Sequence, residues 1–301
     1  MNLKKEIHIT ILFLLLGWVL TAQVERPNAK PYTIQTTYEK LLKKHPDIFP
    51  IQELKSPDIV ADENITYSSV DSYALTADVY YPVNSKKPCP AVILVHGGGW
   101  ISGSKENQRV MAQHLAQNGF VAMTVNYRLA DVAKYPAAVE DLNAAVDFLY
   151  HSKYPLEKDK MAILGASAGA QLAALIGVKN SKIKAIVNVD GIVSFIHPEA
   201  EEGQYAGYWL GGMKAGNFET WKAASALEFI NPKSPPVLFI NSSQPRFHAG
   251  RDDMVTKYNE WNIYSEVHTI PDSPHSFWLV NPWFQPTLNY TVEFLTKVFN
   301  P

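Results

Sequence analysis

The stretch that decides the fold is Gly165-Ala166-Ser167-Ala168-Gly169, which follows a strand-like run at residues 160–164 and precedes a helix expected over residues 170–178. Small residues two positions on either side of the serine let a strand and a helix approach closely, and the strained turn between them exposes the hydroxyl. This stretch therefore predicts a nucleophile, Ser167, at the end of a buried strand.

A second motif, His96-Gly97-Gly98-Gly99-Trp100, lies about seventy residues earlier and directly follows the apolar run at residues 90–95. A glycine-rich loop at the end of a strand can aim backbone N–H groups at a developing anion. We expect an oxyanion hole formed by the amides of Gly98, Gly99 and Ala168. The ring of His96 is expected to hold the shape of this loop.

Continuous apolar runs, such as residues 91–95 and 237–240, alternate along the chain with amphipathic segments. This alternation is typical of an α/β fold with a mainly parallel central sheet flanked by helices. Active sites of such sheets gather at the carboxyl ends of the strands. Ser167, the glycine loop and the segments after residues 241 and 271 are all expected at that edge.

The nucleophile requires a base and an acid that orients the base. His275, in a loop after the last predicted strand, fits the base. For the acid we favour Asp252, which comes after the strand predicted at residues 236–241 and follows the flexible Gly250. Asp253 suits a helix N-cap better, and Asp190, at the end of the preceding strand, is the third candidate.

From about Tyr67 to the C-terminus the chain resembles the α/β-hydrolase fold, and within it the bacterial esterases similar to hormone-sensitive lipase and feruloyl esterases. The resemblance implies carboxylester hydrolysis, a structural role for Asp141 beneath the site, and a likeness to carbohydrate acetylesterases. The matching segments are the glycine loop, Asn126-Tyr127-Arg128-Leu129, residues 136–141, the serine stretch and Pro274-His275.

The organisation of the chain is predicted as a signal peptide (1–22), an N-terminal arm (23–60) and a hydrolase domain (61–301) with a cap insertion (192–234). Lys4 and Lys5 before an apolar run at residues 9–20 are typical of a secretory signal. That run is too short to span a bilayer, so we expect an exported protein, periplasmic or secreted, with no integral membrane segment after cleavage. The single cysteine, Cys89, is expected to be a small hydrophobe and cannot form an internal disulfide.

The composition and charge of the chain restrict the kinds of ligand and macromolecule that it is expected to bind. The chain of 301 residues has 27 Lys and Arg against 29 Asp and Glu, a formal net charge of −2. We find no basic patch for nucleic acid, no metal-ligand spacing and no phosphate cradle. The expected enzyme needs no cofactor, and its oligomeric state is left open.

The cap insertion mixes carboxylates with aromatic residues, which suits stacking on sugar rings better than binding at a lipid surface. Trp100 and Trp278 are expected to contact the substrate. The sequence thus predicts a secreted serine esterase that deacetylates plant-type polysaccharides or oligosaccharides such as xylan or pectin. The alternatives are a feruloyl esterase, a broad short-chain carboxylesterase and, more remotely, a catalytically dead carbohydrate-binding protein.

Overall fold

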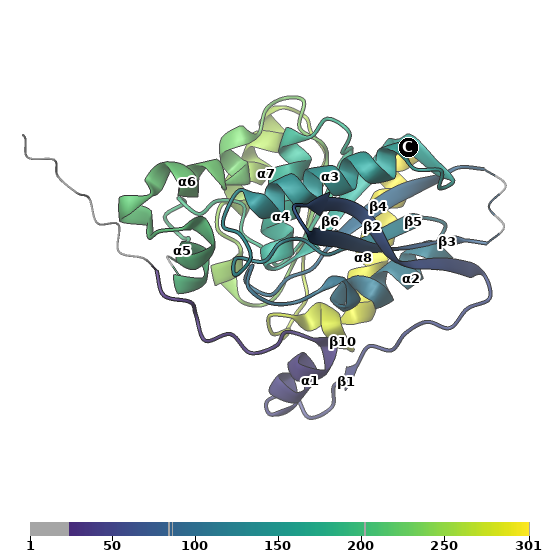
Figure 1. Ribbon diagram of the computed structural model, residues 1–301, viewed down its shortest axis with the longest axis horizontal. Helices are drawn as coiled ribbons and strands as arrows, with labels where there is room; N and C mark the ends of the chain where they lie inside the picture. Colours follow the sequence, from purple (N-terminus) through teal and green to yellow (C-terminus); the bar gives the residue numbers. More distant parts are fainter. Residues whose placement is uncertain (1–23, 84, 86, 202, 301) are drawn as a thin grey trace, which may run out of the picture.

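The computed structural model describes residues 24–83, 85, 87–201 and 203–300 (Figure 1). The predicted signal peptide, residues 1–22, lies outside this part of the chain. No helix among the described residues is long and apolar enough to cross a membrane.

An eight-stranded sheet forms the centre of the molecule, with the strand order β2-β3-β5-β4-β6-β7-β8-β9. The pairs β2/β3 and β3/β5 are antiparallel, and every pair from β5/β4 to β8/β9 is parallel. The mainly parallel sheet predicted from the apolar runs is therefore confirmed. The eight strands are β2 (Ile59–Val70), β3 (Tyr73–Pro82), β4 (Cys89–Val95), β5 (Val121–Val125), β6 (Leu156–Ala166), β7 (Ala185–Val189), β8 (Val237–Asn241) and β9 (Ser265–Thr269).

Helices cover both faces of this sheet (Figure 1). One hydrophobic cluster joins α3, α4 and α7 to one face, and a second joins α2 and α8 to the other. Alternate residues of β4 divide between the two: Ile93 faces the first cluster and Leu94 the second. Burial on both faces explains why the central strands are continuously apolar. The helices are α2 (Arg109–Gln117), α3 (Ala137–His151), α4 (Ala168–Lys179), α7 (Arg251–Glu260) and α8 (Phe284–Phe299).

Between β7 and β8 the chain leaves the sheet and forms the region predicted as a cap. It contains α5 (Gln204–Leu210), α6 (Phe218–Ala223) and 3-10 turns at Lys214–Gly216 and Ala226–Phe229. Trp209 and Trp221 are fully buried within it, whereas Tyr205 and Phe218 are exposed. The cap is thus a packed unit that presents a few aromatic rings outward.

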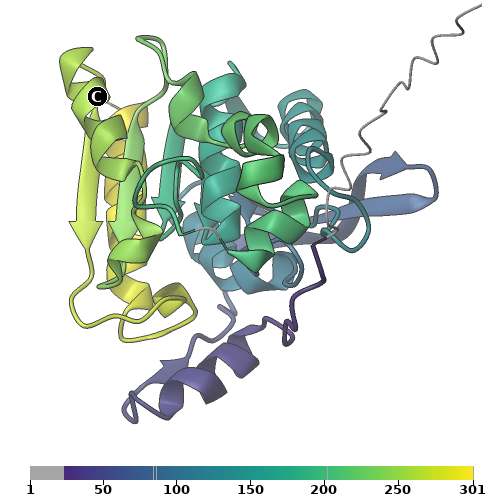
Figure 2. The same ribbon diagram turned by 90° about the vertical axis from the view of Figure 1, so that its left-hand side faces the viewer.

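The described part of the predicted N-terminal arm is residues 24–60, of which the last two already belong to β2. The arm crosses the edge of the molecule below the cap helices (Figure 2). It contains a helix not expected from the sequence, α1 (Ile34–Leu42), which is capped by Thr33. Its short strand β1 (Phe49–Pro50) pairs antiparallel with β10 (Val280–Asn281). The arm is therefore fastened to the segment that follows the predicted base, His275.

Candidate active site

Ser167 stands at the junction of β6 and α4, with φ of 54° and ψ of −121°. This left-handed backbone is strained for a residue with a side chain. A Cβ on Gly165 would overlap the carbonyl oxygen of Gly169, so the strand and helix cross here at backbone contact. The close crossing requires small residues on either side of the serine, as the sequence predicts.

The loop between β9 and a 3-10 turn at Phe277–Leu279 brings His275 to Ser167. Its Nε2 lies 2.9 Å from the Ser167 Oγ, and its Nδ1 lies 2.7 Å from Oδ2 of Asp190. Because a carboxylate faces Nδ1, that nitrogen holds the proton and Nε2 is left to accept the serine proton. The predicted pair of Ser167 and His275 is therefore brought together in the geometry that a base requires.

Asp190 follows the last residue of β7 and has φ of 55°. Its side chain is fully buried. The Ser242 N–H donates to its Oδ1 at 2.8 Å, while Oδ2 accepts from His275. On the same side, Nε2 of His248 lies 3.8 Å from Oδ1. Burial, together with the charge of Arg251, lowers the pKa of His248.

The prediction that Asp252 orients His275 is wrong. Asp252 lies in the first turn of α7 with its side chain 80% exposed, and its Oδ1 accepts from Arg251 Nε at 2.7 Å. That hydrogen bond lowers the pKa of the Asp252 carboxyl. The alternative, Asp253, is also exposed and lies 3.3 Å from Nε2 of His197.

The segment between β8 and α7 explains why Asp252 does not reach His275. It forms a 3-10 turn at Pro245–Phe247 and lays the ring of Phe247 flat on His275, with centroids 3.6 Å apart. The following helix then points its carboxylates toward solvent. Asp190 could have been found by the rule that located Ser167, since it too ends a buried parallel strand.

The glycine loop lies directly beside the serine. A Cβ on Gly97 would be 2.7 Å from the Ala166 carbonyl oxygen and 3.1 Å from the Ser167 Cβ. Gly98 and Gly99 have φ of 118° and 60°, which are accessible to glycine. Among the hydrogen bonds of the described residues, none uses the amides of Gly98, Gly99 or Ala168. These three N–H groups are free to bind an oxyanion.

His96 supports the glycine loop from within. Its ring stacks on Tyr127 with centroids 4.4 Å apart, and its Nδ1 lies 2.7 Å from the Gly97 carbonyl oxygen. Burial lowers the pKa of His96 to about 4, so the ring is neutral at physiological pH. It shapes the loop and lies in the core.

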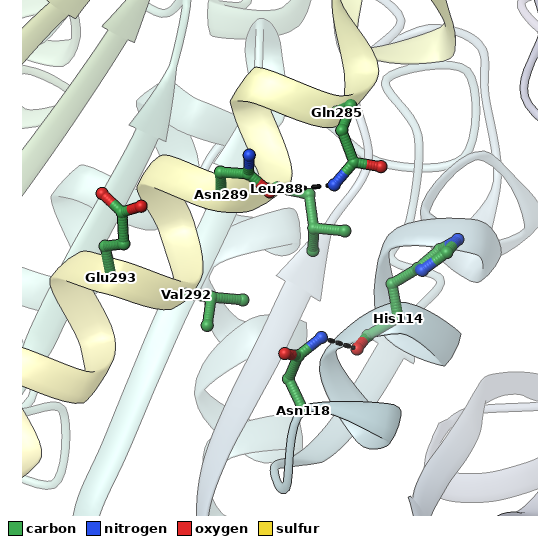
Figure 3. Close-up of a pocket in the computed structure, with 7 residues that line it drawn as sticks. All are labelled: His114, Asn118, Gln285, Leu288, Asn289, Val292 and Glu293. Atoms are coloured by element: carbon green, nitrogen blue, oxygen red, sulfur yellow. Dashed lines mark hydrogen bonds between the residues drawn. The ribbon is translucent and has the colours of Figure 1, made fainter.

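Ser167 and His275 open onto a cavity of about 1050 Å³. Its walls come from the glycine loop, the cap, including Tyr205, and the N-terminal arm. A second depression, of about 250 Å³, lies between α2 and α8 and holds none of the predicted site residues (Figure 3). Within the described part of the chain, no group of three or more His, Cys, Asp or Glu is arranged to hold a metal ion.

The two tryptophans expected to contact substrate differ in position. Trp100 is largely buried and lines the cavity, donates from Nε1 to Gln171 at 3.1 Å, and stacks on Trp209. Trp278 is 3% exposed and meets the His275 ring edge-on at 5.2 Å. It is not among the described residues that line the cavity, so it supports the base, contrary to the prediction.

Comparison with known proteins identifies the family of this chain. The family model described as BD-FAE matches residues 77–257, which is more than half of the chain. The chain belongs to the BD-FAE family. The BD-FAE match contains the glycine loop, Ser167 and Asp190, and ends before His275.

Two curated relatives share shorter stretches with this BD-FAE chain. A probable isoprenylcysteine alpha-carbonyl methylesterase of Arabidopsis thaliana is 31% identical over 32% of the chain, and esterase LipC of Mycobacterium tuberculosis is 33% identical over 31%. The matched stretches span only 21% and 24% of the lengths of these two relatives.

Solved structures support the fold. A truncated carbohydrate esterase from gut microbiota superimposes with a TM-score of 0.65 over 84% of this chain and 99% of that one, at 20% identity. The likeness, with the sheet described above, establishes the α/β-hydrolase fold for this member of the BD-FAE family.

Proposed function

We propose that this protein is a serine carboxylester hydrolase that removes acetyl groups from carbohydrates. The observation that carries the proposal is the unbroken chain of contacts from Ser167 through His275 to the buried Asp190. An ordinary tight turn does not need a strained serine with a base at hydrogen-bond distance. Membership of the BD-FAE family and the esterase relatives support the same reaction class.

In the proposed reaction, His275 Nε2 takes the proton of Ser167 as Oγ attacks the acyl carbonyl carbon. The amides of Gly98, Gly99 and Ala168 stabilise the oxyanion. His275 then gives its proton to the leaving alcohol oxygen, and an acyl-serine remains. Water attacks this ester with the same histidine as base, which releases the carboxylic acid and restores the serine. Asp190 holds the imidazole in its tautomer and stabilises the imidazolium.

A small acyl group is favoured by the inner wall of the cavity. Phe195 and Trp100 are both buried, and Trp100 is held against Trp209 and Gln171. Rings held by packing and by a hydrogen bond form a fixed wall, which suits a small acyl group. We therefore favour acetate over ferulate.

Export through the predicted signal at residues 1–22 suits an extracellular glycan such as acetylated xylan or pectin. The exposed ring of Tyr205 on the cavity wall can stack on a sugar. Both points support a carbohydrate substrate over a lipid.

The first test is hydrolysis of 4-nitrophenyl acetate by the wild type and by Ser167→Ala. We expect turnover by the wild type and a loss of roughly 10⁶-fold in kcat in the variant. A wild type without turnover would contradict the esterase proposal and favour the carbohydrate-binding alternative.

The second test measures the release of acetate and ferulate from xylan and pectin that carry both esters. We expect acetate to be released preferentially. Preferential release of ferulate would reassign the enzyme as a feruloyl esterase.

A further inference from the structure

The N-terminal arm is held over the site by contacts at several points. Its Arg26 pairs with Asp131 at 2.7 Å, and its Tyr32 carbonyl oxygen accepts from Asn107 Nδ2 at 2.9 Å. The cap joins it through Gln204, whose Nε2 donates to the carbonyl oxygen of Glu25 at 3.1 Å. Arm and cap therefore meet beside the cavity, consistent with the view in Figure 2.

Tyr32 connects the arm to the loop at residues 270–276 that carries His275. Its hydroxyl lies 3.1 Å from Oγ of Ser276, the residue after His275. Tyr32, Ser276 and His275 all line the same cavity as Ser167. Burial raises the pKa of the Tyr32 hydroxyl, so it stays protonated as a hydrogen-bond donor.

The chemistry of ester cleavage decides which part of the substrate lies here. His275 must deliver its proton to the oxygen of the leaving alcohol, so that oxygen has to sit within hydrogen-bond reach of Nε2. The alcohol moiety consequently extends along the residues around His275. These are Tyr32 from the arm and Phe247, whose ring covers the imidazole.

The size of the cavity supports the same assignment. A volume of about 1050 Å³ slightly exceeds the roughly 300–1,000 Å³ usual for small-molecule sites. An acetyl group fills only a small part of it. The remainder extends along the arm as far as Lys40 and Leu41 in α1, which suits an alcohol made of several sugar rings.

We infer that the N-terminal arm, through Tyr32, forms the subsite for the carbohydrate alcohol on the His275 side of Ser167. This inference rests on the proposed esterase function and names the part of the chain that selects the leaving group. Tyr32 binds the sugar by its ring edge and hydroxyl, and Phe247 offers a neighbouring apolar surface.

The test compares two acetate esters that differ only in the alcohol: 4-nitrophenyl acetate and acetylated xylo-oligosaccharides. We expect Tyr32→Ala to lower kcat/KM for the oligosaccharides about tenfold or more, mainly through KM. The same change should lower kcat/KM for the aryl ester by a clearly smaller factor, less than about threefold, because its single-ring alcohol is shorter than a chain of sugars. Tyr32→Phe, which keeps the ring, should fall between wild type and Tyr32→Ala.

The matched control is Tyr38→Phe. Tyr38 belongs to the same arm but packs on the cluster of Leu41, Ile48 and Val280 and is not itself among the described residues that line the cavity. It should leave both activities unchanged.

Equal losses on both esters after substitution of Tyr32, or no loss on either, would overturn the inference. A wild type that hydrolyses the aryl ester but not the oligosaccharides would also overturn the inference. That result would still be consistent with the esterase proposal. A wild type that hydrolyses neither ester would instead overturn the esterase proposal itself.

Discussion

The contact between Asp190 and His275 determines which ring nitrogen of the base carries the proton. A buried carboxylate is costly unless its lone pairs are satisfied. Here the Ser242 N–H occupies one oxygen and the His275 N–H the other. The carboxylate thus fixes the imidazole, and its negative charge stabilises the imidazolium that forms as Ser167 attacks.

Asp190→Asn is predicted to lower kcat for 4-nitrophenyl acetate by roughly 10⁴-fold, because an amide can stabilise the wrong tautomer of His275. Asp252→Asn should change kcat less than about twofold, because this carboxylate is exposed, pairs with Arg251 and does not contact His275 in the described structure. Steady-state kinetics on both variants, with circular dichroism to confirm folding, makes the comparison. A large loss in the Asp252 variant would return the role to Asp252.

Which residues could be predicted from the sequence depends on how local their signal is. Ser167 and the glycines lie in contiguous motifs whose conformation is encoded within a few residues, and His275 follows the last strand. The acid has no such motif, since any loop at the same sheet edge can supply it. Asp252 is excluded as the partner of His275 by the path of the turn at Pro245–Phe247, which places the ring of Phe247 on His275.

At the scale of elements, the site depends on how closely α4 crosses β4 and β6. A Cβ on Gly169 would overlap the carbonyl oxygens of Val95 and His96, at the end of β4. The same strand end begins the glycine loop. The spacing of α4 against β4 therefore sets the distance between the nucleophile and the oxyanion donors.

Gly169→Ala is predicted to destabilise the protein by about 1–3 kcal/mol through overpacking. It should also lower kcat by roughly 10²-fold, because the helix and the glycine loop are pushed apart. Denaturant unfolding and aryl acetate kinetics measure the two effects. Gly216→Ala is the control, because its Cβ would meet no atom within 4 Å; an unchanged kcat in Gly169→Ala would show that the crossing tolerates a methyl group.

Helices with a long hydrophobic pattern can be predicted from the sequence, and helices with a short or weak pattern cannot. Helix α3 (Ala137–His151) is 15 residues long, and its buried apolar positions recur at the spacing of a helix, so its pattern can be read from the sequence. Helix α1 has only 9 residues, of which Thr37 and Leu41 are buried, so its pattern is too short to identify a helix from the sequence. Its position beside the turn at Phe277–Leu279 depends on contacts with residues distant in the sequence, which no local pattern reports.

At the scale of the whole molecule, burial of histidines links stability to pH. Burial lowers the pKa of His96 to about 4, and lowers those of His114 and His248 as well. In the unfolded chain these histidines bind a proton near pH 6.5, whereas His96 in the folded protein binds one only near pH 4. Between these values the unfolded state binds more protons, so stability falls as the pH falls.

The free energy of unfolding is therefore predicted to decrease between pH 6.5 and pH 4, with roughly 3 kcal/mol of the loss from His96. Urea unfolding at a series of pH values measures it. His96→Asn should make the dependence on pH shallower. A free energy of unfolding that is constant from pH 7 to pH 4 would contradict the assignment of His96 as a buried neutral ring.

The most direct measurement for the central claim is the site of a covalent adduct with an aryl phosphonate ester, a mimic of the tetrahedral intermediate. After incubation, intact-mass and peptide mass spectrometry should find one phosphonyl group per chain, attached to Ser167, and none in Ser167→Ala. The rate of labelling should drop strongly in Asp190→Asn and stay unchanged in Asp252→Asn. A folded wild-type protein that gains no adduct, or gains it at another residue, would contradict the assignment of Ser167 as a nucleophile activated by His275 and Asp190.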